Sequence, residues 1–288
     1  MKETEDCFLK VKKDYLKFLN QEKIFNKSIT DKITSLKRTY IPISFWIENK
    51  YKKKGKTLFL GFSGGQGSGK TTTLYSILKQ LSNKSKKIIT IEDPVEYKLP
   101  NIQQVAINNE IGLTFSEILR NVLRQDPDVL MIGEIRDKES LDIAIQASLT
   151  GHLVLATLHT NDSISTINRL LDLEAEPFLV ASTLKTIISQ RLVLKLCEHC
   201  KIKIDDEDNI YDNFGCVKCN LTGYKNREII SEIFVSDEKI SSMICKHIDI
   251  NEIINYCKTK GFKTLLENGM AKVKEGIVNK KEIYKVTS

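Results

Sequence analysis

Short aliphatic runs alternate with amphipathic segments through the middle of this 288-residue chain. Each run has the length and composition of a buried strand, and the segments between them repeat apolar residues at helical spacing. The candidate strands are TLFLGF (57–62), KIITI (87–91), DVLMIG (128–133) and HLVLATL (152–158), and the candidate helices cover 71–81, 114–126 and 138–151. Strands that alternate with helices predict an α/β fold with a mostly parallel sheet.

The two ends of the chain carry different patterns. Residues 1–57 are lysine-rich and weakly amphipathic, which predicts a short helical and basic N-terminal segment. From about Glu176 the pattern is mainly helical, interrupted by a cysteine-bearing loop. We therefore expect four parts: the N-terminal segment 1–57, the α/β core 58–192, a cysteine segment 193–223, and a strand with a helical subdomain at 224–288.

A glycine-rich segment, FSGGQGSGKTTTLY (62–75), joins the first candidate strand to the first helix. The pattern Gly64-x-x-x-x-Gly69-Lys70-Thr71 is that of a P-loop, in which backbone N–H groups and a helix N-terminus hold phosphates. Lys70 is expected to reach the β- and γ-phosphates of ATP, and the Thr71 hydroxyl is expected to bind Mg²⁺. The candidate nucleotide-binding residues are Gly64, Gly65, Gln66, Gly67, Ser68, Gly69, Lys70, Thr71 and Thr72.

Carboxylates follow two of the other candidate strands. Glu92 and Asp93 end the second strand, where they could hold Mg²⁺ through water or orient a nucleophile; alternatively, Asp93-Pro94 only shapes a turn. Glu134 follows the strand DVLMIG and could position and polarise the attacking water. Gly133 occupies the place of the usual strand-end aspartate. Glu134 would therefore have to act as the carboxylate of this strand end, with help from Glu92 and Asp93.

Two of the four histidines flank the last candidate strand of the core, with His152 before it and His159 directly after it. A histidine at the carboxyl end of a strand can reach a γ-phosphate and sense whether it is present. A lone histidine is more often structural. The paired placement favours a sensor role for His159, and we include His152 among the candidate nucleotide-binding residues.

Four of the seven cysteines form two CxxC pairs, Cys197–Cys200 and Cys216–Cys219, separated by fifteen residues. This spacing is typical of a tetrahedral zinc site with four thiolate ligands. The segment between the pairs is polar and acidic, so a metal would supply its folding energy.

Composition bears on the partners and the cellular location of the protein. The net charge of +7 is compatible with an anionic partner, but a solvated lysine-rich surface explains it, and we expect no direct nucleic-acid contact. The sequence has neither an apolar run of about 18 residues, as a membrane span requires, nor an N-terminal signal segment. We therefore expect a cytoplasmic protein with reduced cysteines.

These motifs, in this order, resemble those of the secretion ATPases of type II secretion and type IV pilus assembly (GspE/PilB-like). The resemblance covers roughly Gly67 to the C-terminus and rests on GSGKTTTLY (67–75), IEDPVEY (91–97), IGLTFSEILRNVLRQDPDVLMIGEIRD (111–137), AIQASLTGHLVLATLHTND (144–162) and EPFLVASTLKTIISQRLV (176–193).

The resemblance implies a RecA-like ATPase core that works as a homo-hexameric ring and drives pilus or pseudopilus assembly. It implies partners in the inner-membrane assembly platform, and hence a peripheral location at the inner face of the cytoplasmic membrane. It also implies that Arg120 and Arg124 are placed to touch a phosphate in their own or a neighbouring site. The tetracysteine segment favours an assembly motor over a retraction motor, because retraction-type relatives generally lack it.

The resemblance weakens towards the N-terminus. Gly65-Gln66 replaces the family's Pro-Thr pair, and Tyr40–Thr71 resembles the N-terminal part of D-glycerate kinase-like small-molecule kinases. Residues 1–57 are also shorter than the N-terminal domain of the secretion family. Two alternatives to a complete motor therefore stay open: a nucleotide-binding but motor-inactive core, and a small-molecule kinase.

Overall fold

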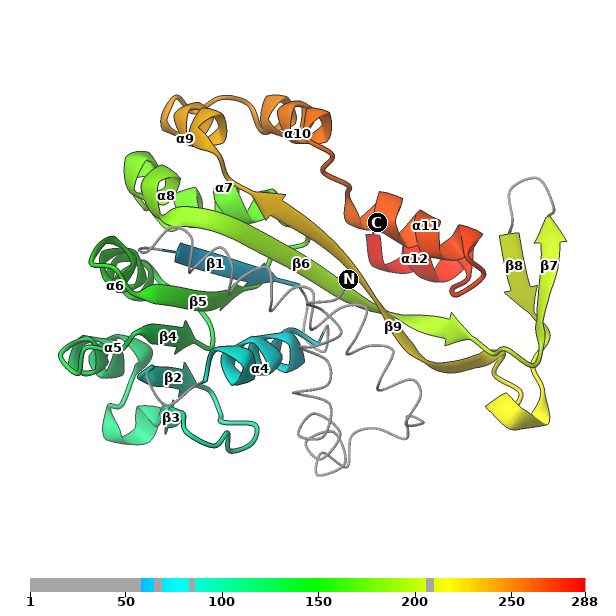
Figure 1. Ribbon diagram of the computed structural model, residues 1–288, viewed down its shortest axis with the longest axis horizontal. Coiled ribbons are helices and arrows are strands. Elements are labelled where there is room, and N and C mark those ends of the chain that lie inside the picture. Colours follow the sequence, from blue (N-terminus) through cyan, green and yellow to red (C-terminus); the bar gives the residue numbers. More distant parts are fainter. Residues whose placement is uncertain (1–57, 65–68, 83–85, 206–209, 288) are drawn as a thin grey trace.

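The computed structural model describes residues 58–64, 69–82, 86–205 and 210–287. The sequence interpretations of residues 1–57, including the helix expected there, lie outside the described residues. Figure 1 shows an α/β body with a hairpin projecting from one end of it.

The body is built on a seven-stranded sheet with the order β3-β2-β4-β5-β1-β6-β9. All neighbouring strands are parallel except β6 and β9. The strands are β1 (Leu58–Ser63), β2 (Ile88–Glu92), β3 (Gln103–Ala106), β4 (Val129–Ile132), β5 (Leu153–Leu158), β6 (Leu184–Leu196) and β9 (Tyr224–Val235). The predicted mostly parallel sheet is confirmed.

Helices cover both faces of the sheet because successive residues of its buried strands point to opposite sides. On one face Ile88, Val129 and Leu153 pack under α4 (Lys70–Leu81). On the other face Ile89, Leu130 and Val154 pack with a larger group of helices. That group comprises α5 (Phe115–Leu123), α6 (Lys138–Leu149), α7 (Ser165–Asp172), α8 (Pro177–Thr183), α9 (Glu238–Cys245) and α10 (Ile250–Thr259).

The three helices expected in the core are present as α4, α5 and α6. Helix α5 begins after Thr114, whose hydroxyl accepts a hydrogen bond from the Glu117 N–H. Helix α6 begins after Asp137, whose carboxylate accepts from the Ser140 N–H.

The mainly helical expectation from Glu176 onward is wrong in part. Helix α8 ends at Thr183, and β6 then runs for 13 residues, past the expected core boundary at residue 192. The apolar residues of β6 are too closely spaced to separate a helix from a strand by periodicity alone. This segment is a strand because it pairs with β9, which follows the cysteine segment.

The C-terminal region packs on the far end of β6 and β9. Helices α11 (Leu265–Lys274) and α12 (Lys280–Thr287) bury Val273 and Ile283 against Val193 and Ile230. The projecting hairpin is β7 (Lys201–Asp205) and β8 (Ile210–Asn213), which lie between the two cysteine pairs (Figure 1). Among the described residues no helix is both long and apolar enough to cross a bilayer.

Candidate nucleotide site and cysteine centre

The candidate nucleotide residues gather where parallel strands end. Strands β2, β4, β5 and β1 are consecutive in the sheet and parallel, so their carboxyl ends lie at one edge. Glu92 ends β2, Glu134 follows β4, His159 follows β5, and the P-loop follows β1. Four segments up to 95 residues apart in the chain thereby meet, since 159 minus 64 is 95.

Lys70 begins α4 and folds back over the loop. Its ammonium donates to the carbonyl oxygens of Gly64 at 2.5 Å and Leu158 at 3.4 Å. Burial lowers the pKa of Lys70 to about 8, and the positive charge of Arg191 adds to this effect, whereas Glu134 opposes it. The half-buried Thr71 and Thr72 follow in the first turn of α4, while Gly65, Gln66, Gly67 and Ser68 lie outside the described residues.

Gly69 has a structural reason to be glycine. Its φ of 84° lies in the left-handed region, and a Cβ there would lie 2.9 Å from Nε2 of Gln190 on β6. The close approach of the loop to β6 therefore depends on the missing side chain.

Glu134 is held from two sides. One carboxylate oxygen accepts from Arg136, at 2.7 Å from Nε and 2.6 Å from Nη2, and the other lies 2.9 Å from Nε2 of His159. The Glu134 side chain is only 15% exposed. Its hydrogen bond raises the pKa of Arg136. The structure thus brings Glu134, His159 and Lys70 together and adds Arg136, which the sequence interpretation missed, although its position two residues after Glu134 was a signal.

Gly133, which occupies the place of an expected aspartate, is packed against β2. A Cβ at this position would lie 3.0 Å from the Ile91 carbonyl oxygen and 3.2 Å from Glu92 Cα. A carboxylate here would push β4 away from β2, so the acid of this strand end is carried by the next residue.

Glu92 is buried, with 3% of its surface exposed. Its carboxylate accepts hydrogen bonds from the Tyr75 hydroxyl, from Thr90 Oγ1 at 2.6 Å and from Gln104 Nε2 at 3.0 Å. These bonds tie α4 to β2 and β3. Asp93 is exposed, and its charge contributes to the raised pKa of Arg136.

Three candidate residues remain to be placed. His152 precedes β5, at the opposite edge of the sheet from His159, and a six-residue strand separates them by roughly 20 Å. Its Nδ1 lies 2.9 Å from the Ala147 carbonyl oxygen, at the end of α6, which is a structural role. Arg120 is exposed and pairs with Glu139, and Arg124 is exposed at the C-terminal end of α5. His152, a candidate nucleotide-binding residue, therefore lies at the opposite end of β5 from the site, whereas His159 lies in it.

The four cysteines meet at the base of the β7–β8 hairpin. All four Sγ atoms lie within 4.8 Å of one another, with Cys197–Cys216 at 3.9 Å and Cys200–Cys219 at 3.8 Å. Zinc–sulfur bonds of about 2.3 Å in a tetrahedron require sulfur–sulfur separations of about 3.8 Å. The residues present therefore fit a zinc ion.

The surroundings of Cys219 suit a thiolate ligand. The N–H groups of Cys216 and Gly223 each donate to its Sγ at 3.2 Å. Burial alone would raise its pKa, but these hydrogen bonds lower the pKa of Cys219 to about 6. Backbone N–H groups that donate to metal-ligating sulfur hold it in place and stabilise its charge.

Comparison with known proteins decides the family. Residues 49–285 match the family model described as "Type II/IV secretion system protein". The chain belongs to this family.

Two curated relatives come from a type II secretion system and a type IV pilus system. The chain is 47% identical over 225 residues to the type II secretion system protein HxcR of Pseudomonas aeruginosa, covering 78% of this chain and 47% of HxcR. It is 44% identical to the type IV pilus assembly ATPase PilB of Thermus thermophilus, covering 77% of this chain and 27% of PilB. The chain thus spans about half or less of the length of these relatives.

Solved structures of other ATPases share the fold. The structure of the pilus retraction motor PilT with bound ADP superposes with a TM-score of 0.66 at 27% identity, over 83% of this chain and 64% of PilT. The Legionella pneumophila ATPase DotB superposes with a TM-score of 0.61 over 80% of this chain and 60% of DotB. The predicted RecA-like ATPase core is confirmed as the fold class.

The family match also bears on the N-terminal half of the P-loop. The match to the family model begins at residue 49. The sequence motifs predicted that the resemblance starts only at Gly67. Strand β1, which feeds the loop, is flanked by β5 and β6 of the same ATPase sheet. The kinase alternative is therefore not favoured.

Proposed function

We propose that this chain is the ATP-hydrolysing motor core of a type II secretion or type IV pilus-like assembly system. The observation that carries the proposal is the grouping of Lys70, Glu134, Arg136 and His159 at one edge of the sheet. Membership of the secretion family, whose curated members include a pilus assembly ATPase, supports the same reading.

Each residue of this group has a proposed task. Lys70 binds the β- and γ-phosphates of ATP, the P-loop N–H groups surround them, and Thr71 Oγ1 holds Mg²⁺. Glu134 orients the attacking water. Arg136 holds Oε2 of Glu134, while Oε1, which lies 2.9 Å from Nε2 of His159, keeps a second lone pair that can accept the proton of this water. A γ-phosphate would compete with Glu134 for the guanidinium of Arg136, so ATP binding would loosen this ion pair.

The remaining candidates have weaker support. Because Glu92 accepts a hydrogen bond from Tyr75 on α4, it suits a role in holding α4 against the sheet. The exposed Asp93 stays a candidate for water-mediated contact with Mg²⁺. Arg120 and Arg124 are exposed on α5, which suits contact with a neighbouring subunit's nucleotide rather than with their own. We propose that role for them within a homo-hexameric ring.

The cysteine centre favours an assembly motor. We propose that Cys197, Cys200, Cys216 and Cys219 hold one zinc ion, which stabilises the β7–β8 hairpin. The identity to the assembly ATPase PilB, 44%, exceeds the 27% identity to the retraction motor PilT and supports the same direction. The motor would act in the cytoplasm, bound to membrane platform proteins at the inner face of the membrane.

Steady-state ATP hydrolysis by the purified chain with Mg²⁺ tests the proposal. We expect slow hydrolysis whose rate per chain rises with protein concentration, because neighbouring subunits complete the site. Glu134→Gln should abolish hydrolysis and leave ATP binding intact, whereas Glu198→Gln, at an exposed residue near the cysteines, should leave both unchanged. Hydrolysis unaffected by Glu134→Gln would refute the mechanism.

A further inference from the structure

Arg191 lies near the carboxyl end of β1, although no sequence motif singles it out. Strands β1 and β6 are parallel, with Ser63 opposite Ser189, so Arg191 lies two residues beyond the point where β1 gives way to the loop. Its neighbour Gln190 approaches Gly69 and accepts a hydrogen bond from Thr73 Oγ1 at 2.8 Å. This part of β6 therefore forms one wall of the nucleotide site.

The guanidinium of Arg191 is partly buried and bonded to main-chain oxygens. Nη2 donates to the Asn161 carbonyl at 2.7 Å and Nη1 donates to the Gln190 carbonyl at 3.2 Å. Within the described part of the chain no carboxylate forms an ion pair with it. Burial lowers the pKa of Arg191 despite the charges of Glu232 and Asp162.

The two carboxylates that act on Arg191 are already engaged elsewhere. Asp162 accepts from the N–H groups of Ile164 and Ser165 at the start of α7. Glu232 accepts from the N–H groups of Ser163 and Leu265. Neither needs the arginine as a partner, so its charge is available for another anion.

Arg191 and Lys70 bind the same loop from two sides. Lys70 donates to Leu158 and Arg191 donates to Asn161, and His159 lies between these two residues. Two partly desolvated cations that are held near each other by neutral carbonyls repel, and an anion between them would relieve the repulsion. A carbonyl is also a weaker partner for guanidinium than a phosphate, with which it forms paired charged hydrogen bonds.

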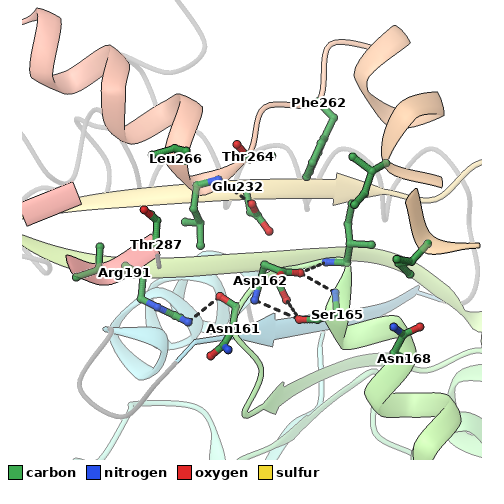
Figure 2. A pocket seen from close by; sticks show the side chains of 15 residues that line it. Asn161, Asp162, Ser165, Asn168, Arg191, Glu232, Phe262, Thr264, Leu266 and Thr287 are labelled. Carbon is green, nitrogen blue, oxygen red and sulfur yellow. Dashed lines mark hydrogen bonds between the residues drawn. The ribbon is translucent and has the colours of Figure 1, made fainter. Parts of the chain in front are cut away.

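The side chain has room to move. Arg191 and Asn161 line one end of a cleft of about 430 Å³, whose far wall comes from α11, α12 and the segment before α11 (Figure 2).

We propose that Arg191 is a second phosphate-binding cation of this nucleotide site and contacts the γ-phosphate in the same subunit. The proposal rests on the proposed ATP binding at Lys70. It makes Arg191 a residue that distinguishes ATP from ADP, and it couples the γ-phosphate to the His159–Asp162 loop, which loses its arginine contact when ATP binds.

The test compares nucleotide affinities in a Glu134→Gln background, where ATP survives the measurement. Arg191→Gln should weaken Mg-ATP binding by about 10- to 100-fold, as expected for a lost charged hydrogen bond, and change Mg-ADP binding by less than about threefold. Arg191→Lys should fall between. Arg169→Gln, at an exposed arginine on α7, is the matched control and should change neither affinity.

Different results would overturn the role of Arg191 and the proposed ATP-driven function. If the parent protein binds no ATP, the proposed function fails. If it binds ATP but Arg191→Gln binds ATP as tightly as the parent does, or loses ATP and ADP affinity equally, the inference is overturned. Retained ADP binding also shows that the variant is folded, and Arg191→Lys supplies the comparison if Arg191→Gln does not fold.

Discussion

Replacing Lys70 by methionine should stabilise the nucleotide-free protein while it removes nucleotide binding. Burial lowers the pKa of Lys70 from 10.5 to about 8, so the folded state holds this charge at a cost. A pKa lowered from 10.5 to about 8 corresponds to an upper bound of about 3 kcal/mol. The ammonium is only partly buried, and solvent screening reduces the expected gain to about 1–2 kcal/mol.

The difference in stability between Lys70→Met and the parent depends on pH. Because the folded pKa lies below the unfolded one, the cost of the charge is fully present below pH 8 and disappears as the pH rises towards 10.5. The melting temperature of Lys70→Met should therefore exceed that of the parent by about 3–6 °C at pH 7, and the difference should shrink between pH 8 and 10.5. Lys225→Met, at an exposed lysine on β9, is the control.

Differential scanning calorimetry or fluorimetry without nucleotide measures the difference directly. A second scan with Mg-ATP should raise the melting temperature of the parent and leave that of Lys70→Met unchanged, because only the parent gains binding energy. A parent that is as stable as Lys70→Met at pH 7, or more stable, would refute the desolvation argument.

Three further changes test other parts of the fold. Cys216→Ser should lower bound zinc from about one ion per chain, measured by elemental analysis, and a full zinc complement in the variant would contradict a four-cysteine site. Thr264→Ala removes the capping box that Thr264 forms with Glu267 at the start of α11, and chemical denaturation should show a loss of about 1 kcal/mol. Gly269→Ala would place a Cβ 2.7 Å from Cγ2 of Ile283 and should destabilise the α11–α12 pair by about 1–3 kcal/mol in the same assay; unchanged stability would mean that the helices separate freely.

Local signals predicted the ATPase core well because they act within a few residues. The P-loop spacing, the helical periodicity and the short aliphatic runs each depend on neighbours in the chain. Helices α4 and α5 and strands β1, β2, β4 and β5 appear where these signals place them. The CxxC pairs likewise predicted a cluster that the fold brings within 4.8 Å.

Signals that depend on distant partners were misread. The pattern from about Glu176 predicts mainly helix, but β6 is a strand because it pairs with β1 on one side and β9 on the other. The sequence makes both His152 and His159 candidates for the nucleotide site, but the strand between them places them at opposite edges of a parallel sheet.

The sequence by itself determined the chemistry this chain can perform: a phosphate-binding loop, an acid after a buried strand, and four thiols at metal spacing. Only the tertiary structure decided which groups share one site. It joined Glu134 to Arg136 and His159, buried Glu92 in hydrogen bonds, and set Arg191 beside the loop. The physical reason is that a sheet orders its strands by long-range pairing, which local pattern does not encode, and that order brings charges from distant segments together.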